Sequence, residues 1–331
     1  MNVLLLSSST GGHIYPCFEL GKYLETKGIN VTYLGFKGQM EESILPKDKL
    51  ITIDSKNSFK KVLSSPFEII KLIKDINKLK NKKYDIYIGF GGFITILSLF
   101  LKKDKPLLIH EQNIILGDSN KLCRRYSNKV LYSFECDDNK GILVGNPSGD
   151  NIKKKEFIYK NIFNVLFIFG SLGSSTLIEK LMIIDSKLDD KHSYTLVIGS
   201  KLFSRFKNKF NKIKVKEFID LRNEIDNYDI VFSRGGATTL YEVIQSNTYC
   251  VSIPSPYVKN NHQEKNVDYL VNRNLVSKIK EKDFSLTTIS NHINSFIDFD
   301  FALSRYKNLC EFKINNSREL IYQEIIKNVK Y

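Results

Sequence analysis

Residues 229–242 of the 331-residue sequence contain the side chains that a phosphate-binding turn requires. The dipeptide Gly235-Gly236 breaks a short apolar run, and Thr238 is a good N-cap for the helix expected next. Unpaired N–H groups at a helix N-terminus attract phosphate, glycines let the backbone approach it closely, and Arg234 adds a positive charge. Glu242, one helical turn past Thr238, is placed to accept hydrogen bonds from ribose hydroxyls. The alternative interpretation is an ordinary strand-to-helix connection with a solvated glutamate.

A second cluster of polar side chains, His-Glu-Gln-Asn at 110–113, follows the apolar run at 107–109. Four residues with full hydrogen-bonding capacity at the end of a buried strand are costly unless their polar groups are used. His110 and Glu111 have side chains suited to acid–base catalysis. The alternative is a satisfied structural network.

Two more polar side chains follow a proline-bounded loop near the end of the second half of the chain. Pro254 and Pro256 end an expected strand, and a loop leads from them to an expected helix. Gln263 and Asn266 are three apart on that helix, so we expect their amides to share one face.

The elements expected around the first glycine-rich turn are those of a parallel sheet. A strand at 3–6, the turn Thr-Gly-Gly-His at 10–13 and a helix at 14–27 are followed by a strand at 31–34. This order implies a right-handed crossover, and it places the turn at the carboxyl ends of the strands, where open α/β sheets bind ligands. A second glycine-rich turn, Gly-Phe-Gly-Gly-Phe at 89–93, also follows an expected strand.

The same order of elements restarts at residue 165. A strand at 165–169, the turn Gly-Ser-Leu-Gly-Ser at 170–174 and a helix at 177–182 repeat the opening of the chain. Further strands are expected at 196–198, 215–218, 230–232 and 251–253.

Length and pattern together predict two domains, since a chain of 331 residues is long enough for about two domains that each bury a core. We place the linker near 148–162, the first domain at 1–148 and the second at 149–313. A C-terminal helix at about 314–331 is expected to pack back on the first domain. The predicted fold class is α/β, with two Rossmann-like, doubly wound domains that face an interdomain cleft.

The amino-acid composition indicates which kinds of partner the protein binds and in which cellular compartment it folds. The formal net charge of +14 favours anionic partners, although lysines spread along the whole chain would also follow from Lys-rich codon usage. Five scattered cysteines without a C-x-x-C pair argue against a disulfide framework or a zinc site and for a reducing cytoplasm. No run approaches the roughly 18 apolar residues of a membrane span, and the run at 3–6 is too short for a signal peptide. No nucleic-acid partner is expected, because no basic stretch is interleaved with aromatic residues.

Two apolar segments with lysine margins predict peripheral contact with an anionic membrane surface. Between residues 66 and 80, apolar side chains cover more than one helical face and are ringed by four lysines. The segment 93–103, with two lysines at its end, is expected to extend this apolar surface. The alternative is that both helices are packed in the core.

The motifs, taken in order, resemble those of the MurG family, which belongs to glycosyltransferase family 28. They are Thr-Gly-Gly-His at 10–13, Gly-Phe-Gly-Gly-Phe at 89–93, His-Glu-Gln-Asn at 110–113 with Gly117 and Asn120, Gly-Asn-Pro at 145–147, Gly-Ser at 170–171, Gly236 to Glu242, and Gln263 with Asn266. The resemblance implies a GT-B fold, no metal and no cofactor. It also implies an inverting transfer of N-acetylglucosamine from UDP-N-acetylglucosamine to the C4 hydroxyl of the muramoyl sugar of lipid I. This reaction forms lipid II for peptidoglycan at the cytoplasmic face of the cell membrane.

The resemblance also implies roles for single residues. Donor-binding positions are Thr10, Gly11, Gly12, Asn113, Ser171, Ile219, Arg234, Ala237, Thr238, Thr239, Leu240, Glu242, Gln263 and Asn266. Acceptor-binding positions are Gly91, Gly92, Phe93, His110, Gln112 and Asn120. His13 is the expected general base, because an imidazole has a pKa near the working pH, and Glu111 is the reserve candidate.

Three departures from the family pattern leave alternatives open. Ser8 and Ser9 replace glycines of the first loop, Leu172 replaces a glutamine, and Ser148-Gly149 stands where the family has an arginine after Gly-Asn-Pro. The alternatives are a related glycosyltransferase with diacylglycerol as acceptor, a UDP-N-acetylglucosamine 2-epimerase, and a catalytically weak homologue retained for binding.

Overall fold

Short apolar runs bounded by turn residues form the strands, and the stretches between them form helices. The computed structural model describes residues 1–331 except 9, 59–60, 63, 171–172, 313 and 330–331. The chain divides into two compact units. Unit 1 comprises Met1–Asp150 and Ile314–Tyr331, and unit 2 comprises Asn151–Lys313.

Unit 1 is built on a parallel sheet with the strand order β3-β2-β1-β4-β5-β6-β7 among the described residues. The strands are β1 (Asn2–Leu6), β2 (Asn30–Phe36), β3 (Leu50–Ile53), β4 (Ile86–Gly89), β5 (Leu107–Glu111), β6 (Lys129–Tyr132) and β7 (Gly141–Leu143). The order changes direction between β1 and β4, which are paired in parallel. The loops after these two strands therefore flank the topological switch point, where doubly wound folds bind ligands.

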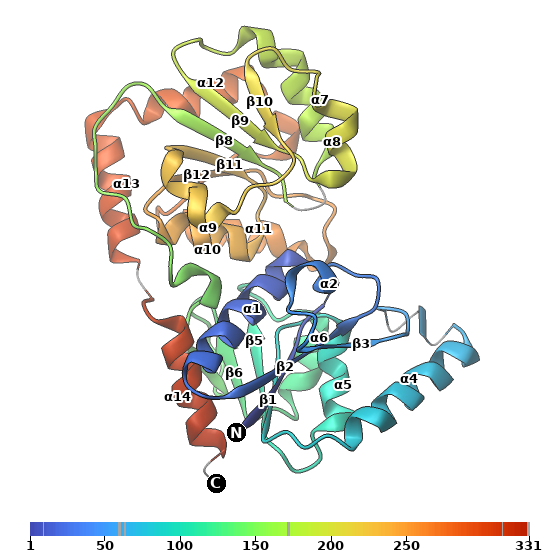
Figure 1. Ribbon diagram of the computed structural model, residues 1–331. Coiled ribbons are helices and arrows are strands. Elements are labelled where there is room, and N and C mark those ends of the chain that lie inside the picture. The colour runs from blue at the N-terminus through green and yellow to red at the C-terminus, as the bar shows by residue number, and fades with distance from the viewer. Residues whose placement is uncertain (9, 59–60, 63, 171–172, 313, 330–331) are drawn as a thin grey trace. The chain divides into compact units, whose positions relative to one another are not determined.

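Helices cover both faces of this sheet (Figure 1). They are α1 (Gly11–Thr26), α2 (Glu41–Ile44), α4 (Pro66–Lys80), α5 (Phe93–Leu101), α6 (Asp118–Arg124), the 3-10 helix η1 (Pro147–Gly149) and α14 (Ser317–Val329). Helix α14 packs beside α1, and Ile321 and Ile325 join the buried cluster that includes Leu20 and Leu24. The C-terminal helix therefore belongs to unit 1.

Unit 2 is built on a second parallel sheet with the order β10-β9-β8-β11-β12-β13 in the part of the chain that is described. Its strands are β8 (Asn164–Ile168), β9 (Ser193–Val197), β10 (Ile213–Lys216), β11 (Ile230–Ser233), β12 (Tyr249–Ser252) and β13 (Ser277–Lys278). Its α-helices are α7 (Ser175–Ile184), α8 (Ser200–Phe206), α9 (Leu221–Glu224), α10 (Ala237–Gln245), α11 (His262–Val271), α12 (Leu286–Ser295) and α13 (Phe299–Glu311). Its 3-10 helices are η2 (Asp185–Lys187), η3 (Ile225–Asn227), η4 (Lys259–Asn261) and η5 (Glu281–Asp283).

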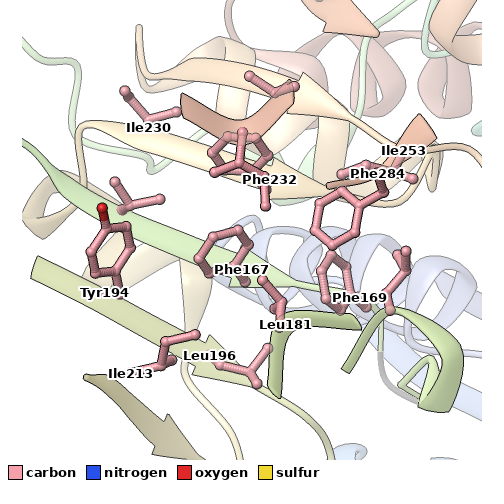
Figure 2. Packing of buried hydrophobic residues seen from close by; sticks show 14 of the residues in the cluster. Phe167, Phe169, Leu181, Tyr194, Leu196, Ile213, Ile230, Phe232, Ile253 and Phe284 are labelled. Carbon is pink, nitrogen blue, oxygen red and sulfur yellow. The ribbon is translucent and has the colours of Figure 1, made fainter. Parts of the chain in front are cut away.

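Aromatic packing fixes the central strands of unit 2 in register. Phe167 of β8 and Phe232 of β11 are register partners, and their rings stack with centroids 5.0 Å apart (Figure 2). Phe169 meets Phe284 edge to face at 6.1 Å. Because Phe169 directly precedes Gly170, this packing also positions the turn that follows β8.

The predicted doubly wound α/β fold is confirmed, and several elements differ in detail. The helix predicted at 66–80 has the bounds of α4, whereas the strand predicted at 215–218 begins two residues earlier, as β10. The short edge strands β3 and β13 were not predicted, because runs of four and two residues carry little periodicity.

Candidate functional site

The carboxyl edge of the unit 2 sheet brings the predicted phosphate-binding turns together. Because β8 and β11 are paired, the turns that begin after them, at Gly170 and at Arg234, emerge from neighbouring strands at the same edge. Gly170 and Gly173 have φ values of +84° and +70°, which favour glycine. A Cβ at Gly173 would also lie 2.8 Å from the carbonyl oxygen of Ile198.

Helix α10 begins directly after the Gly235-Gly236 turn. The Leu240 amide donates to the Gly236 carbonyl at 3.0 Å, so the amides of 237–239 are the ones that precede the first hydrogen bond of the helix, at the carboxyl edge of the sheet. The prediction that Thr238 is the N-cap is wrong, since Gly236 holds that position. Thr238 and Glu242 are each 7% exposed. Ser171, a predicted donor-binding residue, lies outside the described residues.

Helix α11 reaches the same turn. A Cβ on Gly235 would lie 2.6 Å from the carbonyl oxygen of Gln263, so this close approach requires glycine. The Asn266 side chain donates to the Gly235 carbonyl at 3.0 Å, and the Gln263 side chain accepts from the Ser255 amide at 2.8 Å. Both predicted sugar-binding amides are therefore next to the turn. Ile219 follows β10 at this edge and is buried.

Arg234 is bound within unit 2 by three groups. Its guanidinium donates to Glu281 Oε2 at 2.6 Å, to Ser174 Oγ at 2.6 Å and to the Ile253 carbonyl at 3.1 Å. Both side chains of the Arg234–Glu281 ion pair are largely buried. The ion pair offsets the positive charge that the sequence predicts for this turn, and the hydrogen bond to Ser174 ties the two turns together. A donor contact of Arg234 stays a prediction.

In unit 1, the turn after β1 holds His13 in one tautomer. His13 Nδ1 lies 3.0 Å from the Ser8 carbonyl oxygen. A carbonyl only accepts, so in the neutral ring Nδ1 carries the proton and Nε2 carries the lone pair. Nε2 lies against the turn after β4, because a Cβ at Gly91 would be 2.9 Å from it. Gly91 has a φ of +103°, so glycine is favoured there on two grounds.

The two turns at the switch point of unit 1 are in direct contact. A Cβ at Gly92 would lie 3.1 Å from the Ser8 carbonyl oxygen, and Gly92 has a φ of +78°. Ser8 replaces a glycine of the family pattern, yet its main chain supports His13. Thr10, Gly11 and Gly12 lie at the start of α1 at this same edge.

His110 is a buried, neutral connector. Its Nε2 donates to the Gly145 carbonyl at 2.9 Å, so its Nδ1 accepts from the Gln112 amide at 3.0 Å. The same Gln112 amide group donates to the Phe90 carbonyl at 3.1 Å. Burial lowers the pKa of His110 to about 4. His110 and Gln112 are 0% and 2% exposed, so their side chains support this edge of unit 1 from within, and an acceptor contact at these positions stays a prediction.

Because its native pKa is lowered to about 4, His110 should make the stability of the protein pH-dependent. Above the ordinary pKa near 6.5 the ring is neutral in both the folded and the unfolded state, and the free energy of unfolding is at its full value. As the pH falls from there to about 4, the unfolded state takes up the proton first, so the free energy of unfolding decreases by about 3 kcal/mol. Urea unfolding of the wild type and of His110→Gln between pH 7 and pH 4 measures this difference. Equal pH dependence of the two proteins would contradict it.

Glu111 organises the loop that follows β5. Its Oε1 accepts from the Asn113 main-chain and side-chain amides at 3.0 and 2.9 Å. Its Oε2 accepts from the Gly117 amide and the Asn120 side chain, both at 2.9 Å. The side chain is 1% exposed. With both oxygens occupied, Glu111 is suited to holding Asn113 and Asn120 in place and poorly suited to taking a proton from a substrate.

The Phe93 side chain packs in unit 1. Its ring stacks on Phe36 with centroids 6.0 Å apart, and it lies in the core cluster of unit 1. An acceptor contact at the position of Phe93 stays a prediction. Sequence reasoning also missed Ser174 and Glu281 as partners of Arg234, since no local pattern links residues so far apart.

A metal centre was not expected from the sequence. Within the described ranges, no group of three or more His, Cys, Asp and Glu side chains is arranged to hold a metal ion.

Family models match both halves of the chain. The glycosyltransferase family 28 N-terminal domain matches residues 3–132, and the C-terminal domain of that family matches residues 164–318. The UDP-N-acetylglucosamine--N-acetylmuramyl-(pentapeptide) pyrophosphoryl-undecaprenol N-acetylglucosamine transferase of Sulfurihydrogenibium sp. (strain YO3AOP1) is 30% identical over 353 residues, with 99% of each chain covered. The protein of the same name from Thermoanaerobacter sp. (strain X514) is 30% identical over 99% of this chain and 100% of its own.

Solved structures share the fold. The crystal structure of Acinetobacter baumannii MurG has a TM-score of 0.77 at 22% identity, covering 98% of this chain and 99% of that one. The calicheamicin glycosyltransferase CalG4 has a TM-score of 0.71 at 12% identity, covering 99% and 98%. These similarities identify the arrangement of two parallel-sheet α/β units as the GT-B fold.

Proposed function

This chain belongs to glycosyltransferase family 28, and from that membership we propose that it transfers N-acetylglucosamine from UDP-N-acetylglucosamine to the C4 hydroxyl of the muramoyl sugar of lipid I. The product is lipid II. The observation that carries the proposal is the likeness, over 99% of both chains, to transferases named for this donor and this acceptor class. The placement of the donor and base motifs at the carboxyl edges of the two sheets supports it.

The proposed reaction is a single displacement. The acceptor C4 oxygen attacks C1 of the donor sugar, the bond from C1 to the β-phosphate oxygen breaks, and His13 Nε2 takes the hydroxyl proton. The amides of 237–239 and the glycine turn that begins at Gly170 stabilise the negative charge that develops on the leaving UDP. Arg234 contributes by holding Ser174, and so the turn, in position.

Glu242 is proposed to bind the ribose of the donor. Replacing it with glutamine removes a charge-assisted hydrogen bond at a site that is 7% exposed. We expect the KM for UDP-N-acetylglucosamine to rise about 10- to 100-fold with a smaller change in kcat, as the loss of one such bond predicts. Steady-state kinetics over a donor series measures this. A change confined to kcat would contradict ribose binding.

An assay with the full chain, UDP-N-acetylglucosamine and a lipid I analogue tests the function. We expect UDP release that depends on the analogue and a product of inverted, β configuration. Transfer to diacylglycerol instead would favour the related lipid glycosyltransferase. Formation of a UDP-sugar product without any lipid acceptor would favour the epimerase, and no turnover at all would favour the binding homologue.

Membrane contact is proposed through α4. Phe67, Ile70 and Ile73 form a stripe on this helix and are 64%, 63% and 52% exposed. The Lys71 ammonium lies 4.9 Å from the centre of the Phe67 ring. An apolar stripe beside lysines suits the interface of an anionic bilayer. Among the described residues, no helix is both long and apolar enough to cross a membrane.

The segment 93–103 contributes little to this surface. Helix α5 packs against α4, and Ile94, Leu97 and Leu101 are buried in the core of unit 1. Phe100 alone among the large apolar side chains of α5 is exposed by more than half. The expectation that 93–103 extends the apolar surface is therefore wrong except at Phe100, because α4 and the sheet cover the rest.

Replacing Phe67, Ile70 and Ile73 with serine should reduce binding to vesicles that contain anionic lipid. Each exposed apolar side chain contributes about 1 kcal/mol or more on insertion, so we expect a loss of roughly 100-fold. Flotation of the full chain with such vesicles measures this. The variant Met182→Ser/Ile183→Ser, which removes exposed apolar side chains from α7, should bind as the wild type does. Equal flotation of all three proteins would exclude α4.

A further inference from the structure

Unit 2 contains a cavity at the edge of its sheet opposite to the phosphate-binding turns. The cavity has a volume of about 420 Å³ and lies between the segment 153–160 and the body of the unit. Phe163 and Asp229, which line it, directly precede β8 and β11, and Tyr249 is the first residue of β12. In a parallel sheet these amino-terminal ends lie away from the carboxyl edge.

Aromatic side chains form the inner wall of this cavity. Tyr249 and Phe296 stack with ring centroids 4.3 Å apart and an interplanar angle of 16°. Phe157 of the segment 153–160 meets Tyr306 of α13 at 5.5 Å, and the segment runs alongside α13 (Figure 1). At the mouth, Ile158 is 72% exposed. The wall therefore offers flat and apolar surface to a ligand.

Four lysines and three carboxylates line the cavity, so its lining has a formal charge of +1. Lys160 lies 2.6 Å and Lys155 3.8 Å from the same carboxylate, that of Asp229. Lys153 pairs with Asp226 at 3.0 Å. Two ammonium groups thus share the Asp229 carboxylate. The Lys160 side chain is 40% exposed, so a bound anion next to it would be attracted by its charge.

The segment 153–160 is anchored, so the cavity is a built feature of unit 2. The Lys155 amide donates to the Ser246 carbonyl at 3.0 Å, and the Lys155 carbonyl accepts from the Asn247 side chain at 3.0 Å. The Tyr306 hydroxyl donates to the same carbonyl at 3.3 Å. These bonds hold the aromatic wall and the lysines in one arrangement.

We propose that this cavity binds a small anion attached to an aromatic or apolar body, at a site separate from the carboxyl edge of the sheet. The aromatic wall receives the body, and Lys160 receives the anionic group, since the Lys155 ammonium donates to the Tyr228 carbonyl inside the unit. The site does not depend on the transfer reaction, so its test stands apart from the assay of function.

Fluorescence titration of the full chain with 8-anilinonaphthalene-1-sulfonate, in saturating UDP, tests the proposal. We expect Lys160→Gln and Ile158→Glu each to weaken probe binding about fivefold, the effect of one partly exposed charge contact. Lys214→Gln removes an exposed lysine of β10 and should bind the probe as the wild type does. The uncharged N-phenyl-1-naphthylamine should bind more weakly than the sulfonate.

Thermal melts followed by circular dichroism establish that each variant is folded. Ile158→Glu changes a side chain that is mostly exposed, so it is the safer variant if Lys160→Gln unfolds. Unchanged affinity in folded Ile158→Glu, or loss of binding in the α4 serine variant, would overturn the proposal. So would a site for the probe that Ile158→Glu weakens in the absence of UDP and that saturating UDP abolishes.

Discussion

Replacing His13 with alanine should lower kcat about 100- to 10,000-fold, the usual contribution of a positioned general base. The Ser8 carbonyl accepts from Nδ1 at 3.0 Å and so leaves the lone pair on Nε2, the atom that lies against Gly91. Only this nitrogen is then able to take the acceptor proton. Steady-state and single-turnover rates with a lipid I analogue measure the loss.

Two comparisons separate loss of the base from loss of structure. UDP affinity should be unchanged in His13→Ala, and added imidazole should restore part of the rate. Gly91→Ala keeps the imidazole but introduces a Cβ 2.9 Å from Nε2 at a φ of +103°, so it should also lower kcat strongly. A His13→Ala enzyme within tenfold of the wild-type rate would refute the assignment.

Replacing Glu111 with alanine should destabilise unit 1 by about 3 kcal/mol and lower activity as a consequence. The carboxylate is buried and accepts four hydrogen bonds, from both amides of Asn113, from Gly117 and from Asn120. Its removal leaves these donors without their acceptor and frees the loop that carries Asn113. Urea unfolding followed by circular dichroism measures the loss of stability.

The control for Glu111 is Glu135→Ala, which removes the same charge from an exposed position of unit 1 and should leave stability within about 0.5 kcal/mol. Glu111→Asp should retain more activity than Glu111→Ala, because a carboxylate remains. Were Glu111→Ala as stable as the wild type but inactive, Glu111 would be the base and His13 would not.

The local parts of the site were predictable from the amino-acid sequence. The alternation of apolar runs and glycines predicted two doubly wound sheets with glycine-rich connections after β1, β4 and β11, although α1 begins at Gly11, three residues before the predicted start. It did so because strand periodicity and glycine conformation are properties of a few neighbouring residues. The bounds of α4 were predicted for the same reason.

The contacts of each polar side chain depend on how distant parts of the chain fold together, and the sequence did not predict them. Arg234 meets Glu281, and His110 meets Gly145, across separations of 47 and 35 residues. The exposure of apolar side chains also depends on the tertiary fold. The sequence of α5 is almost entirely apolar, yet most of this helix is covered by α4 and the sheet. Local sequence determines which side chains stand at the end of each strand. The order of strands in the sheet determines which side chains from distant parts of the chain lie next to them.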